Sequence, residues 1–171
     1  SGQDGVRRFY KARSPALSGF HKPIKETFER FSGDPDRADI LDSTMMHVRS
    51  LTSFCTEIKI WPTFLKLDVQ GAEFDIISTL HKMHEILGIE IELQVLPLYG
   101  GTFTNFTQPA AFLQISGFKP WWIKPIYWTA DHGGHIRISH FDALYINNRS
   151  KAMDDPRMEL VLRAYDKEIG T

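Results

Sequence analysis

The sequence predicts an α/β domain with a mostly parallel sheet that ends in an antiparallel pair of strands. The first observation is a strand, a glycine turn, a helix and a second strand between residues 63 and 96, the order typical of two parallel strands joined by a crossover helix. The second is an alternating apolar run at 136–147, which follows an aromatic run at 118–127. A chain of 171 residues, 42% of them hydrophobic, suits one domain with a sizeable core.

Short elements are predicted before this unit. Residues 12–23 are rich in Pro, Ser and Gly and indicate a loop. Residues 23–31 suit either a short helix that begins at Pro23 or an extended segment. The other elements expected here are a strand at 5–11, a turn at 32–39, a strand at 45–51 and a short helix at 51–58 that Trp61-Pro62 stops.

The central unit is predicted from the spacing of its apolar residues. Residues 63–69 form the first strand, and Gly71 occupies the turn after it. Apolar residues then recur at helical spacing from Ala72 to Leu87, and Gly88 ends the helix.

The second strand of the unit, 89–96, is unusual for a parallel sheet. Its apolar residues alternate with Glu90, Glu92 and Gln94. Parallel strands that are covered on both faces are usually apolar throughout. One face of this strand is therefore expected to meet water, a polar network or a site.

The remainder of the chain is predicted to complete the sheet and to add a helix. Residues 118–127 contain two prolines and suit an edge strand, which pairs antiparallel with the final strand. We divide the chain into a domain at 1–150 and an appended C-terminal helix at 151–171. The other expected elements are a loop at 97–108, a helix at 109–116 opened by Pro109 and closed by Gly117, and a turn at ADHGGH.

The composition excludes several classes of function. A net charge of −1 gives no reason to expect nucleic acid as a partner, and without an apolar run of 18 residues we expect no membrane span. Cys55 is the only cysteine, so an internal disulfide or a cysteine-based zinc site is impossible. We expect a cytoplasmic protein. The chain does not begin with Met, and we expect it to be a fragment of a longer protein.

Acidic residues lie at the end of one strand of the central unit, within the other strand, and in the turn between them. Asp68 ends the first strand, Glu92 lies in the second, and Glu73 follows Gly71. Ligands bind at the carboxyl ends of parallel strands, and a helix beginning at that edge offers free amide donors, so these acids could share one pocket. The simpler alternatives are a capping acid at Asp68, a first-turn acid at Glu73 and a solvated strand face at Glu92.

The same stretches resemble a family. FLKLDVQGAEFDII is similar to the "(L/I)K(I/L)D-x-(E/Q)GAE" signature of the FkbM-type methyltransferases, which depend on S-adenosylmethionine. IEIELQVLPLYGG resembles the strand and "PLY-x-G" loop that follow it in the family. The segments FYKARSPALSGFHKP, FLQISGFKPWWI and FDALYIN match further family segments, so the resemblance covers about residues 6–148.

The resemblance implies the C-terminal part of a Rossmann-like class I methyltransferase domain. The strand and glycine-rich loop that would hold most of the cofactor have no counterpart in this sequence. The chain also has Ser18-Gly19 where the family has two serines, and Ser50-Leu51-Thr52 where the family has an acid.

The implied reaction is O-methylation of a hydroxyl on a small-molecule or carbohydrate acceptor, a sugar or a secondary metabolite. Asp68 would be the catalytic base or would bind Mg²⁺. Glu73 and Glu92 would orient Asp68 or complete a metal shell, and Asp68 and Gly71 would contact the cofactor. Substrate-binding residues would be Tyr99, Ser18, His21 and Asp142.

Two other functions remain open from the sequence. The chain could be a non-catalytic binding or scaffold fragment, because the glycine-rich loop is missing. It could also be a sugar-processing enzyme of another α/β class that uses Asp68 and Glu92 as acid and base. The histidines and tryptophans are expected mostly to be solvated or packed in the core rather than to bind ligands: His132, His135, His140, Trp121, Trp122 and Trp128.

Overall fold

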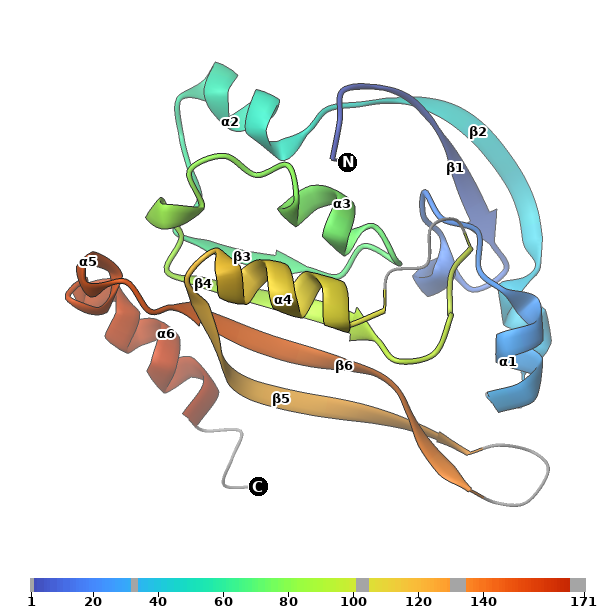
Figure 1. Cartoon of the computed structure of the whole chain (residues 1–171). Helices are drawn as coiled ribbons and strands as arrows, with labels where there is room; N and C mark the ends of the chain where they lie inside the picture. The colour runs from blue at the N-terminus through green and yellow to red at the C-terminus, as the bar shows by residue number, and fades with distance from the viewer. Residues whose placement is uncertain (1, 32–33, 101–104, 130–134, 167–171) are drawn as a thin grey trace.

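The computed structural model describes residues 2–31, 34–100, 105–129 and 135–166. It contains a four-stranded sheet in the order β3-β4-β6-β5 and a separate two-stranded sheet of β1 and β2. In Figure 1, α3 and α4 lie on one side of the larger sheet, α6 lies on the other, and β1 and β2 form a curved ribbon to one side. The larger sheet consists of β3 (Phe64–Leu67), β4 (Gly88–Gln94), β5 (Phe118–Thr129) and β6 (Ile136–Asn147).

This sheet is mixed. β3 and β4 are parallel, as the central unit predicted, whereas β6 is antiparallel to both β4 and β5. The pairings mean that β3, β4 and β5 run in the same direction and that β6, running the opposite way, lies between β4 and β5. The antiparallel final pair and the edge position of β5 are confirmed. Only one of the three pairings is parallel, so the sheet is less parallel than predicted.

The two faces of the sheet differ because β4 alternates. Ile89, Ile91 and Leu93 are almost completely buried in the main core beneath α3 (Glu73–Ile77) and α4 (Thr107–Ile115). The opposite face carries Glu90 and Glu92, which are partly exposed. The expectation that one face of this strand would be polar is therefore confirmed.

Two smaller apolar clusters cover the ends of the polar face. At one end Met158 of α6 (Pro156–Asp166) packs with Leu144 and Ile146 of β6. At the other end Phe28 of α1 (Lys25–Phe31) packs with Tyr99 and neighbouring residues. Between the clusters the sheet presents charged side chains.

The crossover helix is much shorter than predicted. The spacing predicts one helix from Ala72 to Leu87, but α3 ends at Ile77, and Lys82 adopts a left-handed conformation before the 3-10 helix η3 (Met83–Glu85). The hydroxyl of Thr79 donates to the carbonyls of Asp75 and Ile76, an alternative to helical hydrogen bonding. Leu80 and Met83 are still buried, although they lie in a turn and a 3-10 helix, so the apolar spacing does not by itself distinguish these structures from an α-helix.

The N-terminal elements resolve the choices that the sequence left open. The segment at 23–31 forms the helix α1, and the predicted strand at 45–51 begins earlier and ends sooner. The Ser50 side chain caps α2 by accepting from the Ser53 amide. The elements here are β1 (Gly5–Ala12), η1 (Pro15–Leu17), η2 (Pro35–Ala38), β2 (Ile40–Val48) and α2 (Leu51–Ile58).

The appended helix is two helices, α5 (Ser150–Met153) and α6. The phenol of Tyr165 donates to Glu90, which also binds Lys66, so α6 is attached to the polar face of the sheet. In the described parts of the chain, each helix is too short or too polar to cross a membrane.

Candidate active site

A cavity of about 200 Å³ lies where β3 and β4 end. The pairing of Leu67 with Ile91 places Asp68 next to Glu92, and Glu92 pairs with Asp142 of β6. Asp68 and Glu92 both line the cavity. The predicted meeting of these two acids is therefore present in the structure.

The other walls of the cavity are mainly aromatic. Phe28 and Trp128 have ring centroids 5.3 Å apart, and Tyr99 is buried beside them. Arg37 and His140 also line the cavity. The cavity thus combines apolar walls with a few convergent polar groups, as ligand sites commonly do.

Glu92 has the most strongly perturbed carboxyl group in this cavity. Burial, followed by the charges of Asp68, Glu73 and Asp142, raises the pKa of Glu92 from its usual value of 4.5 to about 8. Perturbed carboxyl groups in a cleft are typical of catalytic sites. At neutral pH Glu92 is mostly protonated.

His140 is the neighbour of Glu92 in the site. Its Nε2 lies 3.6 Å from Glu92 Oε2, and burial lowers the pKa of its ring. Its Nδ1 lies 2.8 Å from Ser139 Oγ, and that hydroxyl donates to the Ile126 carbonyl at 3.1 Å. Because Ser139 uses its hydrogen on Ile126, its oxygen accepts from Nδ1–H, which leaves the Nε2 lone pair facing Glu92. With Glu92 protonated and the His140 ring neutral, the Glu92 carboxyl group faces the Nε2 lone pair 3.6 Å away.

A β-bulge lies next to His140 in the pairing of β5 with β6. Ile126 pairs with His140 and Tyr127 pairs with Ile138, so Ser139 is the extra residue on β6. The fully buried Ser139 uses its carbonyl to accept from the amides of residues 95 and 96. Bulges often redirect side chains near functional sites. His140 itself pairs with Gln94, and Asp142 pairs with Glu92, so regular alternation already places His140 on the face that carries Glu92.

Glu73 and Gly71 stabilise the turn between β3 and α3. Glu73 is buried, its Oε1 accepts from the amides of Val69 at 2.9 Å and Gly71 at 3.3 Å, and burial raises its pKa. Gly71 has a φ of 92°, and a Cβ there would lie 3.0 Å from the Tyr99 Cβ. The amides expected to face a ligand thus bind Glu73, and the glycine is needed for packing against Tyr99.

Asp68, unlike Glu73 and Gly71, lines the cavity. It is exposed at the cavity mouth, where it accepts from Gln70 Nε2 at 2.9 Å.

The remaining predicted site residues lie outside the cavity lining. Ser18 Oγ accepts from the Ala12 amide, so it holds the loop against β1. His21 lies between the Gly100 carbonyl, 3.1 Å from Nδ1, and Asp75, 3.5 Å from Nε2. Asp142 is half-buried next to Glu92, and burial raises its pKa. Of the predicted substrate-binding residues, only Tyr99 lines the cavity.

The described residues contain no group of three or more His, Cys, Asp or Glu side chains placed to hold a metal ion. His132 lies outside the described residues, and His135 is exposed. A magnesium ion at Asp68 stays a prediction.

Of the cavity lining, sequence reasoning named only Asp68, Glu92 and Tyr99 as site residues, and four of the lining residues that it missed are aromatic or basic. His140, Trp128, Phe28 and Arg37 were expected to be solvated or packed, or were not considered. The aromatic residues do pack, and they form the cavity wall at the same time. The only available signal was that His140 lies two residues before Asp142, a predicted substrate-binding residue, on the same predicted strand.

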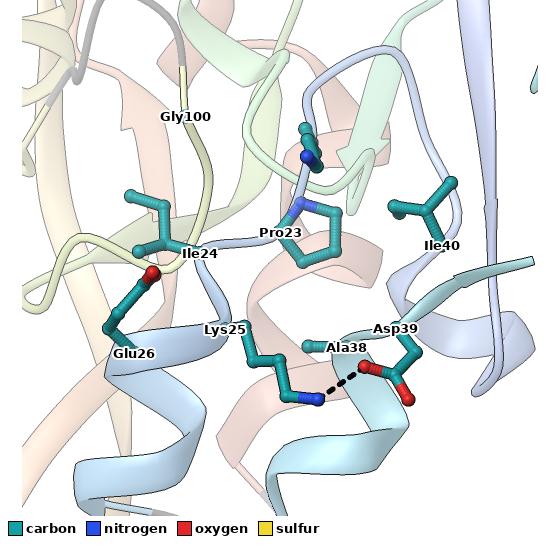
Figure 2. Close-up of a pocket in the computed structure, with 9 residues that line it drawn as sticks. Pro23, Ile24, Lys25, Glu26, Ala38, Asp39, Ile40 and Gly100 are labelled. Carbon is teal, nitrogen blue, oxygen red and sulfur yellow. Dashed lines mark hydrogen bonds and ion pairs between the residues drawn. The ribbon is translucent and has the colours of Figure 1, made fainter.

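A second cavity, of about 470 Å³, is lined by residues 22–26 and 38–40 and by Gly100 (Figure 2). The ammonium group of Lys25 in this cavity binds Asp39. Pro23 and Ile40 provide apolar walls, and none of the predicted site residues lines it. We place the candidate site in the smaller cavity because the perturbed carboxyl and imidazole groups meet there.

Comparison of the chain with models of known protein families, with curated proteins and with solved structures found no match.

Proposed function

We propose that the chain is the acceptor side of a cytoplasmic S-adenosylmethionine-dependent O-methyltransferase domain that acts on a hydroxyl of a sugar or a secondary metabolite. The observation that carries the proposal is the presence of Asp68, Glu92 and His140 at one aromatic-walled cavity. The GAE and PLY motifs support the class of reaction. The three co-directional strands and the reversed β6 agree with the partial Rossmann-like sheet that the resemblance implies.

In this proposal the chain accepts the hydroxyl proton of the acceptor. A base is most effective when its pKa lies near the working pH, and the pKa of Glu92 is about 8. Once Glu92 is ionised, its carboxylate takes the proton from the hydroxyl, while the neutral His140 ring lies 3.6 Å away. Asp68 at the mouth orients the hydroxyl. Tyr99 and Trp128 exclude water, which strengthens these interactions.

The described residues do not fit the whole cofactor. When bound, S-adenosylmethionine would supply an electrophilic methyl group. The cavity of about 200 Å³ is smaller than the roughly 300–1,000 Å³ of pockets that enclose ligands of drug size. The amides of Val69 and Gly71 are also bound to Glu73. We therefore assign only the acceptor side to these residues.

The test measures transfer of a labelled methyl group to a panel of glycosides as a function of pH. We expect a rate that rises with pH and levels above about pH 8, because Glu92 must be ionised to act as the base. Glu92→Gln should remove this pH dependence and lower the rate about 100-fold or more. Asp68→Ala should abolish transfer and leave the fold intact. Unchanged turnover in either variant would show that the assigned residue is structural.

The second candidate function is binding without catalysis. The use of the turn amides by Glu73 and the small cavity favour it, because both reduce the room for a cofactor. Calorimetry with S-adenosylmethionine distinguishes the two functions. Binding near micromolar concentration supports the methyltransferase, and no binding at millimolar concentration supports the binding module.

A further inference from the structure

We propose that His21 is a pH-sensitive latch that controls entry to the smaller cavity. The doubly protonated ring holds the segment at 97–100 against α3, and the neutral ring releases it. This inference goes beyond the proposed function, because it concerns entry to the cavity whatever reaction takes place there. It is carried by the position of the His21 ring between a backbone carbonyl and a carboxylate.

The wall of the smaller cavity is closely packed. Phe28 and Tyr99 line it, and these residues are 0% and 5% exposed. A ligand that reaches Asp68 at the mouth therefore gains room beside Glu92 only when part of the wall moves. Phe28 belongs to a helix, whereas Tyr99 lies in the segment that joins β4 to α4. The Tyr99 segment is the part of the wall that we expect to move.

The segment at 97–100 is joined to residues 22–24. Tyr99 pairs antiparallel with Pro23, and backbone hydrogen bonds of 2.7 and 2.9 Å flank this pair. His21 directly precedes these residues, and its Nδ1 lies 3.1 Å from the Gly100 carbonyl oxygen. A contact between His21 and α3 therefore acts on both segments together.

The His21 ring suits its two neighbours only when it carries two protons. Nδ1 faces the Gly100 carbonyl oxygen, and Nε2 lies 3.5 Å from Asp75 Oδ2. Both oxygens can only accept hydrogen bonds, and the neutral imidazole ring has a single N–H. The neutral ring therefore turns a lone pair toward one of these oxygens. Water cannot compensate at Nε2, because this atom is buried.

The charged groups around the ring also favour its protonated form. Asp75 and Glu73 of α3 are the acids near it, and the contact with Asp75 chiefly raises the pKa of His21. Arg7 of β1 lies 3.3 Å from the same Asp75 oxygen. When His21 loses its proton, Arg7 keeps Asp75 paired, so release leaves no carboxylate without a partner. The latch is thus closed at low pH and opens as the pH rises through the pKa of folded His21.

The test follows hydrogen exchange of the Ile24 and Gly100 amides, which join the two segments, by nuclear magnetic resonance. Protection factors correct for the direct effect of pH on exchange. Between about pH 5.5 and pH 8.5 we expect both protection factors to fall about fivefold or more, with the midpoint at the pKa of the His21 ring. Equal protection at both pH values would overturn the proposal.

Three variants separate the latch from other titrations. In Asp75→Asn the amide can accept from the protonated ring or donate to the neutral ring, so protection should not depend on pH. His47→Asn is the matched control, since His47 is an exposed histidine on β2, and it should keep the wild-type pH dependence. Glu92→Gln should keep it too. A pH dependence that persists in Asp75→Asn, or disappears in either of the other variants, would contradict the latch.

Entry to the cavity is measured separately, by fluorine nuclear magnetic resonance of protein labelled with 4-fluorophenylalanine. Phe28 packs with Tyr99 and is fully buried, and Phe28→Leu identifies its signal. We expect this signal to shift between H₂O and D₂O at about pH 8.5 but not at about pH 5.5, and at neither pH in Asp75→Asn. An unresponsive Phe28 signal at high pH would refute control of entry. Because these measurements need no methyl transfer, they can succeed when the proposed reaction fails.

Discussion

The substitution Glu92→Gln tests the electrostatic argument for the site through protein stability. The folded protein holds the Glu92 proton up to about pH 8, whereas the unfolded chain loses it near the usual pKa of 4.5. Between these values the folded state binds more protons than the unfolded state, so the free energy of unfolding falls as the pH rises. Glutamine has the same shape and cannot ionise, so the variant should not lose this stability.

The size of the effect follows from the two pKa values. They differ by about 3.5 pH units, and about 1.4 kcal/mol per unit gives ~5 kcal/mol as the upper limit. The Glu92 side chain is only 14% exposed, so solvent screens it little. Movement of the exposed Asp68 would relieve part of the repulsion, and we expect the variant to be more stable than the wild type by ~2–5 kcal/mol at high pH.

The assay is urea denaturation followed by tryptophan fluorescence. We expect Glu92→Gln and the wild type to differ little at about pH 4 and by the full amount at about pH 9. Glu29→Gln, the same substitution on the exposed side of α1, is the control. A difference between Glu92→Gln and wild type that is the same at both pH values would refute the assignment of a raised pKa.

Three further predictions concern the surroundings of the site. Gly71→Ala should lower the free energy of unfolding by about 1–3 kcal/mol, because Gly71 has a positive φ and lies against Tyr99. Gly100→Ala, where the new Cβ meets only ordinary contacts, should change this free energy little. Equal effects of the two substitutions would contradict the packing argument. Ile77→Ala should cost about 2–5 kcal/mol in urea denaturation, because this side chain is fully buried in the main core, and a loss below ~1 kcal/mol would contradict that burial. The pKa of His21 is raised, chiefly by its hydrogen bond with Asp75, so His21 stabilises the fold fully below pH 6.5 and this contribution is lost as the pH rises through the folded pKa. Asp75→Asn should lower the pKa of His21, as measured by nuclear magnetic resonance. An unchanged His21 titration would exclude the contact.

The sequence predicted the elements with strong local signals. Apolar runs separated by a glycine turn predicted the parallel pair of β3 and β4, and the strict alternation of apolar and polar residues predicted the polar face of β4. The predicted length of α3 was wrong, because helical spacing shows only which residues are buried. The left-handed conformation of Lys82 and the hydrogen bonds of the Thr79 hydroxyl mark where the chain leaves the helix. The position of β6 between β4 and β5 was also not predicted, since strand order depends on pairings between distant segments.

The candidate site was predicted only in part, because local sequence patterns locate some of its residues and distant pairings locate the others. Asp68 and Glu92 lie at equivalent places on neighbouring strands, so local pattern and topology brought them together. Glu73 looked equivalent in sequence, yet its position below the turn depends on the path of the backbone at Gly71. His140 lies on the same face as Asp142 by simple alternation, but the sequence does not show that β6 is the neighbour of β4, so the approach of His140 to Glu92 was not predicted.

The central position of β6 has a consequence for how the molecule folds. β5 pairs with β6 alone among the described strands, and β6 is made after every other strand of the sheet. Distant pairings form late because long loops must close first. β5 and β6 form a local hairpin, whereas the pairing of β4 with β6 joins distant segments, so we expect the hairpin to form first and the cavity to close only when it docks on β4, against the crowding of Asp68, Glu92 and Asp142. A chain that has bound its ligand has passed this step, so binding would report that folding is complete.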